Sequence, residues 1–436
     1  MSHQIIHMSQ TKNYKSLTIF LFLLLGINLA LVFLFPSKPL KIKEIELPKS
    51  PIDAQIRITF SEPVDQKNIE ENFKFEPETI KGKISWTGKT LVFTPNNNLD
   101  FEKTYSISLP KNIKSLRNST LKNPYTVSFT TPKSSFFYLD KNGYLSQYFP
   151  ASKENFTINN ELKIRTFDYS PSEKLIFAID EKNAGYLINP ETKETEKLDF
   201  ETKINHGKWI PFENSLIISQ TKAETELIKY DLEKEKTEIL KTGDTLAYEI
   251  FISPDGSYIT LIDETGALSL YSLESKKEEL ITREFLEHFG FSEYGGYLLY
   301  TVLTPNGIFD PRNNLMIFKS NGEKEILLEN SNAQIDQPQV SPDETKLIFK
   351  YKVEKPILDF ETPYYLAAMD IETREITILT PEDITINEPK FSPEGKFISF
   401  IKDETEILLY KFAANSYEKD EIISTRLTGS KIEWAY

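Results

Sequence analysis

One short phrase recurs through the last two-thirds of the sequence and constrains the fold more than any other feature. Its fullest copy is FSPEGKFISF, Phe391–Phe400, in which an apolar residue precedes Ser-Pro-acidic-Gly and an alternating apolar run follows. Pro restricts φ and Gly accepts positive φ, so the centre of the phrase predicts a tight turn. The residue before Ser is expected to end one core strand, and the alternating run is expected to form the next.

The copies recur at a spacing that is typical of a β-propeller. The residue before Ser, or its equivalent, is Tyr169, Trp209, Ile252, Phe291, Val340 and Phe391, and Trp434 falls at the same phase near the end. The steps between them are 40, 43, 39, 49, 51 and 43 residues. Four-stranded units repeated about every 40–45 residues are the signature of propeller blades. We therefore predict an all-β fold with a propeller over residues 136–436.

The ends of the array decide the predicted number of blades. Six complete copies predict six blades. Phe136–Phe149 adds two strands with no copy of the phrase, and Lys431–Tyr436 adds a first strand with no followers. Joined, these pieces form a composite seventh blade and close the ring by strand pairing, which removes exposed strand edges. Seven blades are the favoured prediction, and six remain the alternative.

The phrase and its flanking strands resemble the TolB-type propeller repeat, a relative of WD-type blades. The resemblance extends over about 300 residues, from Phe136 to the end. Two copies depart from the pattern, because Ile210-Pro211-Phe212-Glu213 lacks Ser and Gly, and Ser292-Glu293-Tyr294-Gly295 lacks Pro. The resemblance implies a propeller and suggests a subunit of a larger envelope assembly, but it identifies no reaction.

A smaller all-β segment, residues 38–131, precedes the array. Apolar and polar residues alternate in Ile56–Phe60, Tyr105–Leu109 and Tyr125–Phe129, as in half-buried strands. About seven such strands suit an immunoglobulin-like sandwich. The sequence segments ITFSEPVD (Ile58–Asp65) and YTVSFTT (Tyr125–Thr131) resemble the Ig-like domain of bacterial surface-layer (SbsA-like) proteins. That resemblance implies an extracytoplasmic spacer or adhesion module without catalytic residues.

An apolar run near the start predicts a membrane anchor. Leu17–Phe35 contains 19 residues and no charge, and as a helix it would be about 28 Å long, close to the roughly 30 Å hydrocarbon core. A cleaved signal peptide, the alternative, has a shorter apolar region, and no Ala-x-Ala precedes Pro36. Lysines flank both ends, so the positive-inside rule is nearly balanced. The Ig-like resemblance, and not charge, places residues 1–16 in the cytoplasm and the later domains outside the cell membrane.

Composition and motifs exclude several kinds of function. The formal charge of −14 disfavours a nucleic-acid partner, and the absence of cysteine excludes disulfides, thiolate catalysis and Cys-based zinc sites. His-Glu-x-x-His, Gly-x-Ser-x-Gly and P-loop motifs are missing. We therefore predict no catalytic residue, no metal site, no cofactor and no enzymatic activity. The alternative is a glycan- or peptide-processing enzyme that uses two of the 65 Asp and Glu residues at the mouth of the channel.

The two longest steps contain neighbouring insertions, residues 304–312 and 354–363. Each places an aromatic residue beside an acid and between prolines, an arrangement that suits recognition. The candidate partner-binding residues are Asn306, Phe309, Asp310, Arg312, Asp359, Phe360 and Glu361. The alternative is that they are tolerated surface insertions without function. The sequence thus predicts a membrane-anchored envelope protein that presents an Ig-like spacer and a propeller for binding a protein or cell-wall partner.

Overall fold

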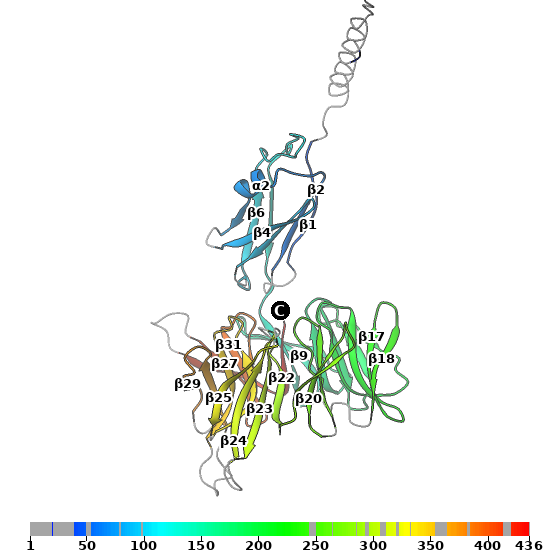
Figure 1. Cartoon of the computed structure of the whole chain (residues 1–436), viewed down its shortest axis with the longest axis vertical. Coiled ribbons are helices and arrows are strands. Elements are labelled where there is room, and N and C mark those ends of the chain that lie inside the picture. Colours follow the sequence, from blue (N-terminus) through cyan, green and yellow to red (C-terminus); the bar gives the residue numbers. More distant parts are fainter. Residues whose placement is uncertain are drawn as a thin grey trace, which may run out of the picture. The chain divides into compact units, whose positions relative to one another are not determined.

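The computed structural model describes the chain in two compact units, which divide chiefly at Thr131–Pro132 (Figure 1). The described residues are residue 20 and residues 39–436, without 49–53, 78–79, 97–98, 244–249, 264, 285, 293–295, 306–310, 320–321, 332, 354–363, 382–383, 413–419 and 436. Apart from Phe20, the predicted membrane span Leu17–Phe35 lies outside them. Within the described residues, no helix combines the length and apolar character that crossing a membrane requires.

The first unit contains two antiparallel sheets. One has the order β1-β2-β5-β4 and the other β3-β6-β7. The strands are β1 (Ile42–Glu46), β2 (Ile56–Phe60), β3 (Lys74–Glu76), β4 (Gly82–Thr87), β5 (Thr90–Pro95), β6 (Thr104–Leu109) and β7 (Tyr125–Thr130). A short helix that the sequence analysis did not predict, α2 (Gln66–Asn72), begins at Asp65, whose carboxylate accepts the Asn68 backbone N–H at 3.1 Å. The alternation in β2 and β6 buries one face of each strand, so these predicted half-buried strands are confirmed.

The second unit consists of antiparallel sheets in which strands follow in chain order. Four sheets have four strands each. The first two are β11 (Ile164–Ser170), β12 (Leu175–Asp180), β13 (Gly185–Ile188) and β14 (Thr195–Lys197), and then β15 (Lys203–Trp209), β16 (Ser215–Thr221), β17 (Thr225–Asp231) and β18 (Lys236–Thr242). The other two are β22 (Leu286–Phe291), β23 (Leu298–Pro305), β24 (Pro311–Phe318) and β25 (Lys324–Ser331), and then β26 (Ala333–Val340), β27 (Lys346–Val353), β28 (Tyr365–Asp370) and β29 (Ile376–Ile378). A fifth sheet contains β19 (Tyr258–Ile262), β20 (Leu268–Ser272) and β21 (Glu278–Thr282), and Ile252 bridges to Ile259 at its edge. The all-β class is confirmed.

The remaining seven-stranded sheet joins the two ends of this unit, in the order β10-β9-β8-β33-β32-β31-β30. Its strands are β8 (Ser135–Asp140), β9 (Leu145–Phe149), β10 (Glu154–Asn159), β30 (Ile386–Phe391), β31 (Phe397–Lys402), β32 (Glu406–Lys411) and β33 (Glu421–Ala435). The first part of β33 pairs with β32, and its last part pairs with β8, so that Trp434 lies opposite Phe136. The end of the chain therefore hydrogen-bonds to the first strand of the unit.

The repeated phrase forms the tight turn that its residues predict. In the last copy, the Ser392 hydroxyl accepts the Phe397 backbone N–H at 3.0 Å, and Gly395 has φ +70°. The Gly395 N–H donates to the Ser392 carbonyl at 2.8 Å. In another copy Glu344 takes the glycine position, with φ +58°. The irregular copy at residues 210–213 also forms a turn, with Phe212 at φ +63°, so this departure from the pattern does not interrupt the fold.

Candidate functional site on the first strands of the propeller sheets

The structure describes little of the predicted partner-binding residues. Six of them, Asn306, Phe309, Asp310, Asp359, Phe360 and Glu361, lie outside the described residues. The backbone of Arg312 lies in β24, opposite Thr304 of β23. Both strands contain eight residues, so part of the first insertion lengthens a hairpin between the second and third strands of its sheet. This site remains a prediction.

A second set of residues occupies one equivalent position on the first strands of the sheets. This position immediately precedes the core residue of each phrase, and its members are Asp168, Lys208, Phe251, Gly290, Gln339, Lys390 and Glu433. In a propeller the first strands surround the central channel. The four charged members lie on strands that contact one another in the order β30, β33, β11 and β15. One side of the ring is therefore charged, and the other side is neutral.

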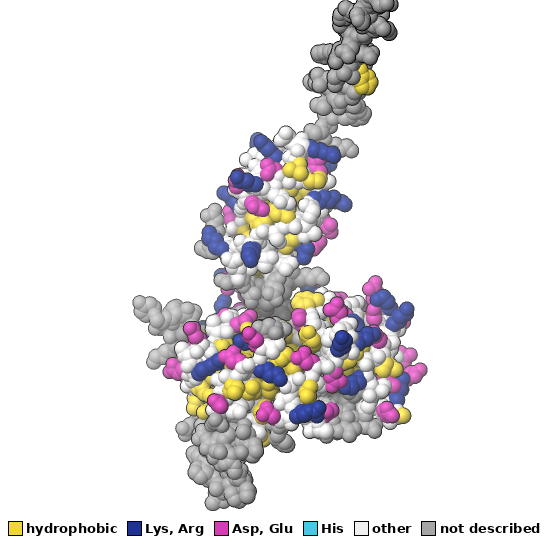
Figure 2. Space-filling model, in the orientation of Figure 1, with side chains coloured by type: hydrophobic (Ala, Val, Ile, Leu, Met, Phe, Trp, Pro, Cys, Tyr) yellow, Lys and Arg dark blue, Asp and Glu magenta, His cyan; other side chains and the backbone are white. Residues whose placement is uncertain are grey.

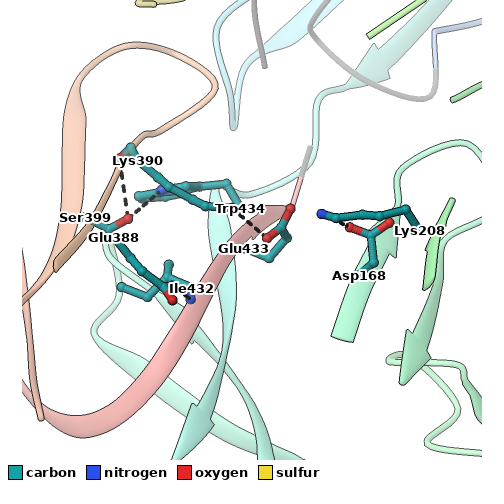
Figure 3. A network of polar contacts seen from close by, with 8 residues as sticks. All are labelled: Asp168, Lys208, Glu388, Lys390, Ser399, Ile432, Glu433 and Trp434. Carbon is teal, nitrogen blue, oxygen red and sulfur yellow. Dashed lines mark hydrogen bonds and ion pairs between the residues drawn. The ribbon is translucent and has the colours of Figure 1, made fainter. Parts of the chain in front are cut away.

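Two short ion pairs join these four residues across neighbouring first strands (Figure 3). The Lys390 Nζ atom lies 2.7 Å from Glu433 Oε2, and the Lys208 Nζ atom lies 2.7 Å from Asp168 Oδ1. The second oxygen of Asp168 accepts the Trp209 backbone N–H at 2.8 Å. Each pair thus links one first strand to the neighbouring first strand, and the register of the repeat places the partners together.

Partial burial makes these interactions strong. The Asp168 and Glu433 side chains are 9% and 15% exposed. Burial by itself would raise the pKa of Glu433, but the charges of Lys390, Lys208 and Lys431 outweigh burial and hold its pKa at about 2. Burial would likewise lower the pKa of Lys208, and the charges of Asp168 and Glu433 raise it instead. Figure 3 shows Glu433 between Lys390 and the Asp168–Lys208 pair.

Lys431 differs from the other two lysines of this cluster. It is a half-buried residue at a bulge in β33, with φ +49°. Its Nζ atom lies 5.9 Å from the centre of the Phe167 ring. It forms no hydrogen bond or ion pair with a residue that the structure describes. Its ammonium group makes no carboxylate contact of the kind that Lys208 and Lys390 make among the described residues, and burial, followed by the charge of Lys208, lowers the pKa of Lys431.

Side chains at neighbouring bulges hold this region in place. Gln337 and Glu388 have φ of +51° and +49° at bulges in β26 and β30. Gln337 Oε1 accepts the Glu388 backbone N–H at 2.8 Å, and Glu388 Oε2 accepts the Ile432 backbone N–H at 3.3 Å. Positive φ is costly for residues other than glycine, and these contacts between sheets offset that cost. The backbone beside Lys431 is therefore rigidly positioned.

The neutral side of the ring is filled differently. The Phe251 ring lies over Gly290, where an added Cβ atom would come within 3.1 Å of it. Farther along the same strands, His288 Nδ1 lies 3.2 Å from Asp336 Oδ1, and Lys350 Nζ lies 3.4 Å from Asp336 Oδ2. His288 therefore has a structural contact between sheets. In the described part of the chain, no cluster of three or more His, Cys, Asp or Glu residues is arranged to hold a metal ion.

The sequence analysis missed the charged side of the ring, although a signal was present. A charged residue directly precedes an aromatic core residue in Asp168-Tyr169, Lys208-Trp209, Lys390-Phe391 and Glu433-Trp434. The bonded partners are 40 and 43 residues apart, which are repeat steps. Aligning the repeats and comparing this one position would have placed the two pairs together.

Comparisons with known proteins agree with this architecture. A family model described as a bacterial Ig-like domain matches residues 47–131. The structure of oligogalacturonate lyase from Vibrio parahaemolyticus is 12% identical, covers 74% of this chain and 97% of that chain, and has a TM-score of 0.50. TolB from Acinetobacter baumannii is 16% identical over 82% of each chain, with a TM-score of 0.40. A putative TolB from Agrobacterium tumefaciens is 15% identical, covers 62% of this chain and 98% of that chain, and has a TM-score of 0.42. The sequence matches no curated protein.

These likenesses bear on the fold alone. The predicted bacterial Ig-like domain is confirmed by the family match, and TolB-type propellers are among the structural neighbours, as the repeat predicts. At such low identities, no activity, substrate or partner passes from those proteins to this chain.

Proposed function

We propose that this chain is a membrane-anchored envelope protein whose Ig-like domain is a spacer and whose propeller binds a protein or cell-wall partner without catalysis. The uncharged run Leu17–Phe35 and the bacterial Ig-like match support this arrangement. In it, residues 1–16 lie in the cytoplasm and the two domains lie outside the cell membrane.

We further propose that the propeller has seven blades. The seven-stranded sheet comprises two of them, because β33 is the last strand of the blade β30-β31-β32 and then the first strand of the blade β8-β9-β10. The other five sheets supply one blade each, and Ile252 belongs to the reduced first strand of the β19-β20-β21 blade. This count supports a closed ring with its charged cluster at the closing blade.

The observation that best supports a binding function is the protonation state of the charged side chains on the first strands. General acid–base catalysis favours groups whose pKa lies near the operating pH. The pKa of Glu433 is instead lowered to about 2, and that of Lys208 is raised, so both groups keep their charge at neutral pH. Permanently charged, rigidly held groups suit recognition better than proton transfer.

The partner-binding test uses the full-length chain in detergent and two ligand classes, purified cell-wall glycan and solubilised envelope proteins. Residues 306–310 and 354–363 are replaced, separately and together, by short Gly-Ser linkers. The matched control replaces residues 222–224, which connect β16 and β17 at the equivalent place in another sheet. We expect binding to fall at least tenfold in the double replacement and to be unchanged in the control.

Two results would overturn this proposal. Full retention of binding after both replacements would exclude the insertions as the binding site. Reproducible turnover of a glycan or peptide, abolished by one Asp or Glu substitution, would establish an enzyme instead. Protease accessibility of the Ig-like domain in intact cells tests the proposed orientation, since a protected domain would place it in the cytoplasm.

A further inference from the structure

We propose that the charged side of the ring binds a carboxylate group of the ligand through Lys431. This inference rests on the proposed binding function and adds a second contact site to it, on first strands β11, β15, β30 and β33. The ligand class is a monoanionic carboxylate, such as the end of a peptide or an acidic sugar.

The arrangement of cations and anions leads to this ligand class. Lys208 and Lys390 each have a carboxylate oxygen at 2.7 Å. Lys431, on the neighbouring strand, has none among the described residues. A partly buried charge without a counter-ion is unfavourable, and a ligand carboxylate would supply the missing partner.

The neighbouring carboxylates already have contacts within the protein. Asp168 is occupied by Lys208 and by the Trp209 N–H, and Glu433 is occupied by Lys390. Glu388 accepts the Ile432 N–H. Among the three lysines of this cluster, the Lys431 ammonium group is therefore the one that has no carboxylate oxygen at hydrogen-bond distance in the described part of the chain, and it has three donors to offer.

The same carboxylates limit the charge of the ligand. Lys431 is influenced by the nearby charges of Glu433 and Glu388 as well as by Lys208. A dianion such as phosphate would gain one free ammonium group and would be repelled by these two carboxylates. A monoanionic carboxylate needs only the single charge that Lys431 offers, which favours it over phosphate.

The pKa of Lys431 supplies an independent readout. Burial and the charge of Lys208 lower it, and a bound carboxylate would raise it again. Binding of the carboxylate therefore requires the protonated amine. Affinity should decrease as the pH rises through the pKa of Lys431, and proton uptake should accompany binding in that range.

The experiment compares matched pairs of probes by calorimetry on the full-length chain in detergent. One pair is N-acetylglycylglycine and its C-terminal amide, and the other is glucuronate and glucose. We expect the carboxylate member of at least one pair to bind about tenfold or more tightly than its neutral partner, because charge-assisted hydrogen bonds are the stronger ones. The pair that shows this preference identifies the source of the carboxylate.

Three variants locate the effect. Lys431→Gln should abolish the preference, Lys431→Arg should keep it, and Lys236→Gln, at an exposed position on β18, should leave it unchanged. Equal binding within both pairs, no binding of any probe, or a preference that survives Lys431→Gln would overturn the proposal. If Lys431→Gln does not fold, the comparison of probes on the unaltered protein, with phosphate as a further probe, decides the question.

The two proposals fail separately. A carboxylate preference without capture of any cell-wall or envelope partner would contradict the proposed function and leave this site standing. Partner binding that is insensitive to Lys431→Gln, with no carboxylate preference, would contradict this site alone.

Discussion

The Ig-like unit and the propeller are built from the same kind of antiparallel sheet, but they bury different chemistry. The core of the Ig-like unit is apolar, with Ile56, Ile58 and Ile107 fully buried. An ion pair of that unit, Arg57–Glu46, is exposed on both sides, at 44% and 60%. In the propeller, the Lys390–Glu433 pair is only 20% and 15% exposed. Burying charge is costly unless it is paired, and in the propeller the Lys390–Glu433 and Lys208–Asp168 pairs meet that condition across neighbouring first strands.

The Ig-like unit and the propeller also differ in the sign of their overall charge. Residues 132–436 contain 34 Lys and Arg residues against 54 Asp and Glu residues, whereas residues 1–131 contain 17 against 11. On the face that Figure 2 shows, charges of both signs are interspersed over the propeller. Three lysines nevertheless converge on Glu433 in this acidic unit. The carboxylates of Asp168, Glu433 and Glu388 balance these three charges, so any attraction of an anionic group comes from Lys431 itself and not from a net positive charge.

The largest expected effect comes from removing the strand that completes the propeller. Deleting Gly429–Tyr436 removes the pairing of β33 with β8 and the buried Ile432 and Trp434 side chains. We expect the thermal midpoint of the propeller transition to fall by more than about 10 °C, since each 1 kcal/mol shifts a domain of this size by about 2–4 °C. Calorimetry of the full chain measures this, with the Ig-like transition as the internal control. An unchanged midpoint would show that the ring does not depend on this closure.

Breaking the buried ion pair should have the next largest effect. Asp168→Ala leaves Lys208 without its carboxylate and removes the acceptor of the Trp209 N–H. We expect a loss of about 3–5 kcal/mol in the free energy of unfolding, reduced somewhat because the Lys208 side chain is 31% exposed. Denaturant titration measures it.

The double variant Asp168→Leu with Lys208→Met is the matched control for this loss. It removes both charges together and should recover part of the stability, because no unpaired charge remains although the Trp209 N–H still lacks its acceptor. A double variant as unstable as Asp168→Ala would show that packing, and not an orphaned charge, accounts for the loss.

Lowering the pH should affect the stability of the propeller and of the Ig-like unit differently. The folded-state pKa of Glu433 is lowered to about 2, below the usual value of about 4.3 in unfolded chains. A lowered carboxylate pKa stabilises the fold above the unfolded value, and this stabilisation is lost as the pH falls from about 5 to about 2. The propeller transition should therefore weaken over this range. Glu433→Gln should flatten that dependence, and an unchanged slope in this variant would contradict it.

The sequence predicts the fold more completely than it predicts the site, for physical reasons. Alternation of apolar residues reports burial locally, so β2 and β6 are read from a few residues each. The turn of the phrase is also local, because Ser392 and Gly395 act within one loop. Even the pairing of Trp434 with Phe136 follows from phase. Helix α2 was not predicted because its seven residues depend on the Asp65 cap and show no apolar period.

The charged cluster was not predicted because its contacts join residues that are distant in the sequence. Lys390 and Glu433 are 43 residues apart, and nothing in either segment marks the other as its partner. Only the register between neighbouring blades places them together. The bulge that positions Lys431 is equally non-local, since the contacts that hold it come from Glu388 on another strand. Sites of this kind require the repeats to be aligned before the charges are compared.

The smallest effect is expected in the Ig-like unit. It tests whether an exposed ion pair there contributes less to stability than the buried pairs of the propeller. Glu46→Ala removes the exposed partner of Arg57, whose Nε atom lies 3.9 Å from the carboxylate. Exposed ion pairs contribute about 0–1 kcal/mol, because water screens them and ordering two long side chains costs entropy. We expect a change below about 0.5 kcal/mol in the unfolding of this unit, measured by the same denaturant titration. A loss comparable to that of Asp168→Ala would mean that exposure does not distinguish the charges of the two units, and that the propeller cluster is not specialised.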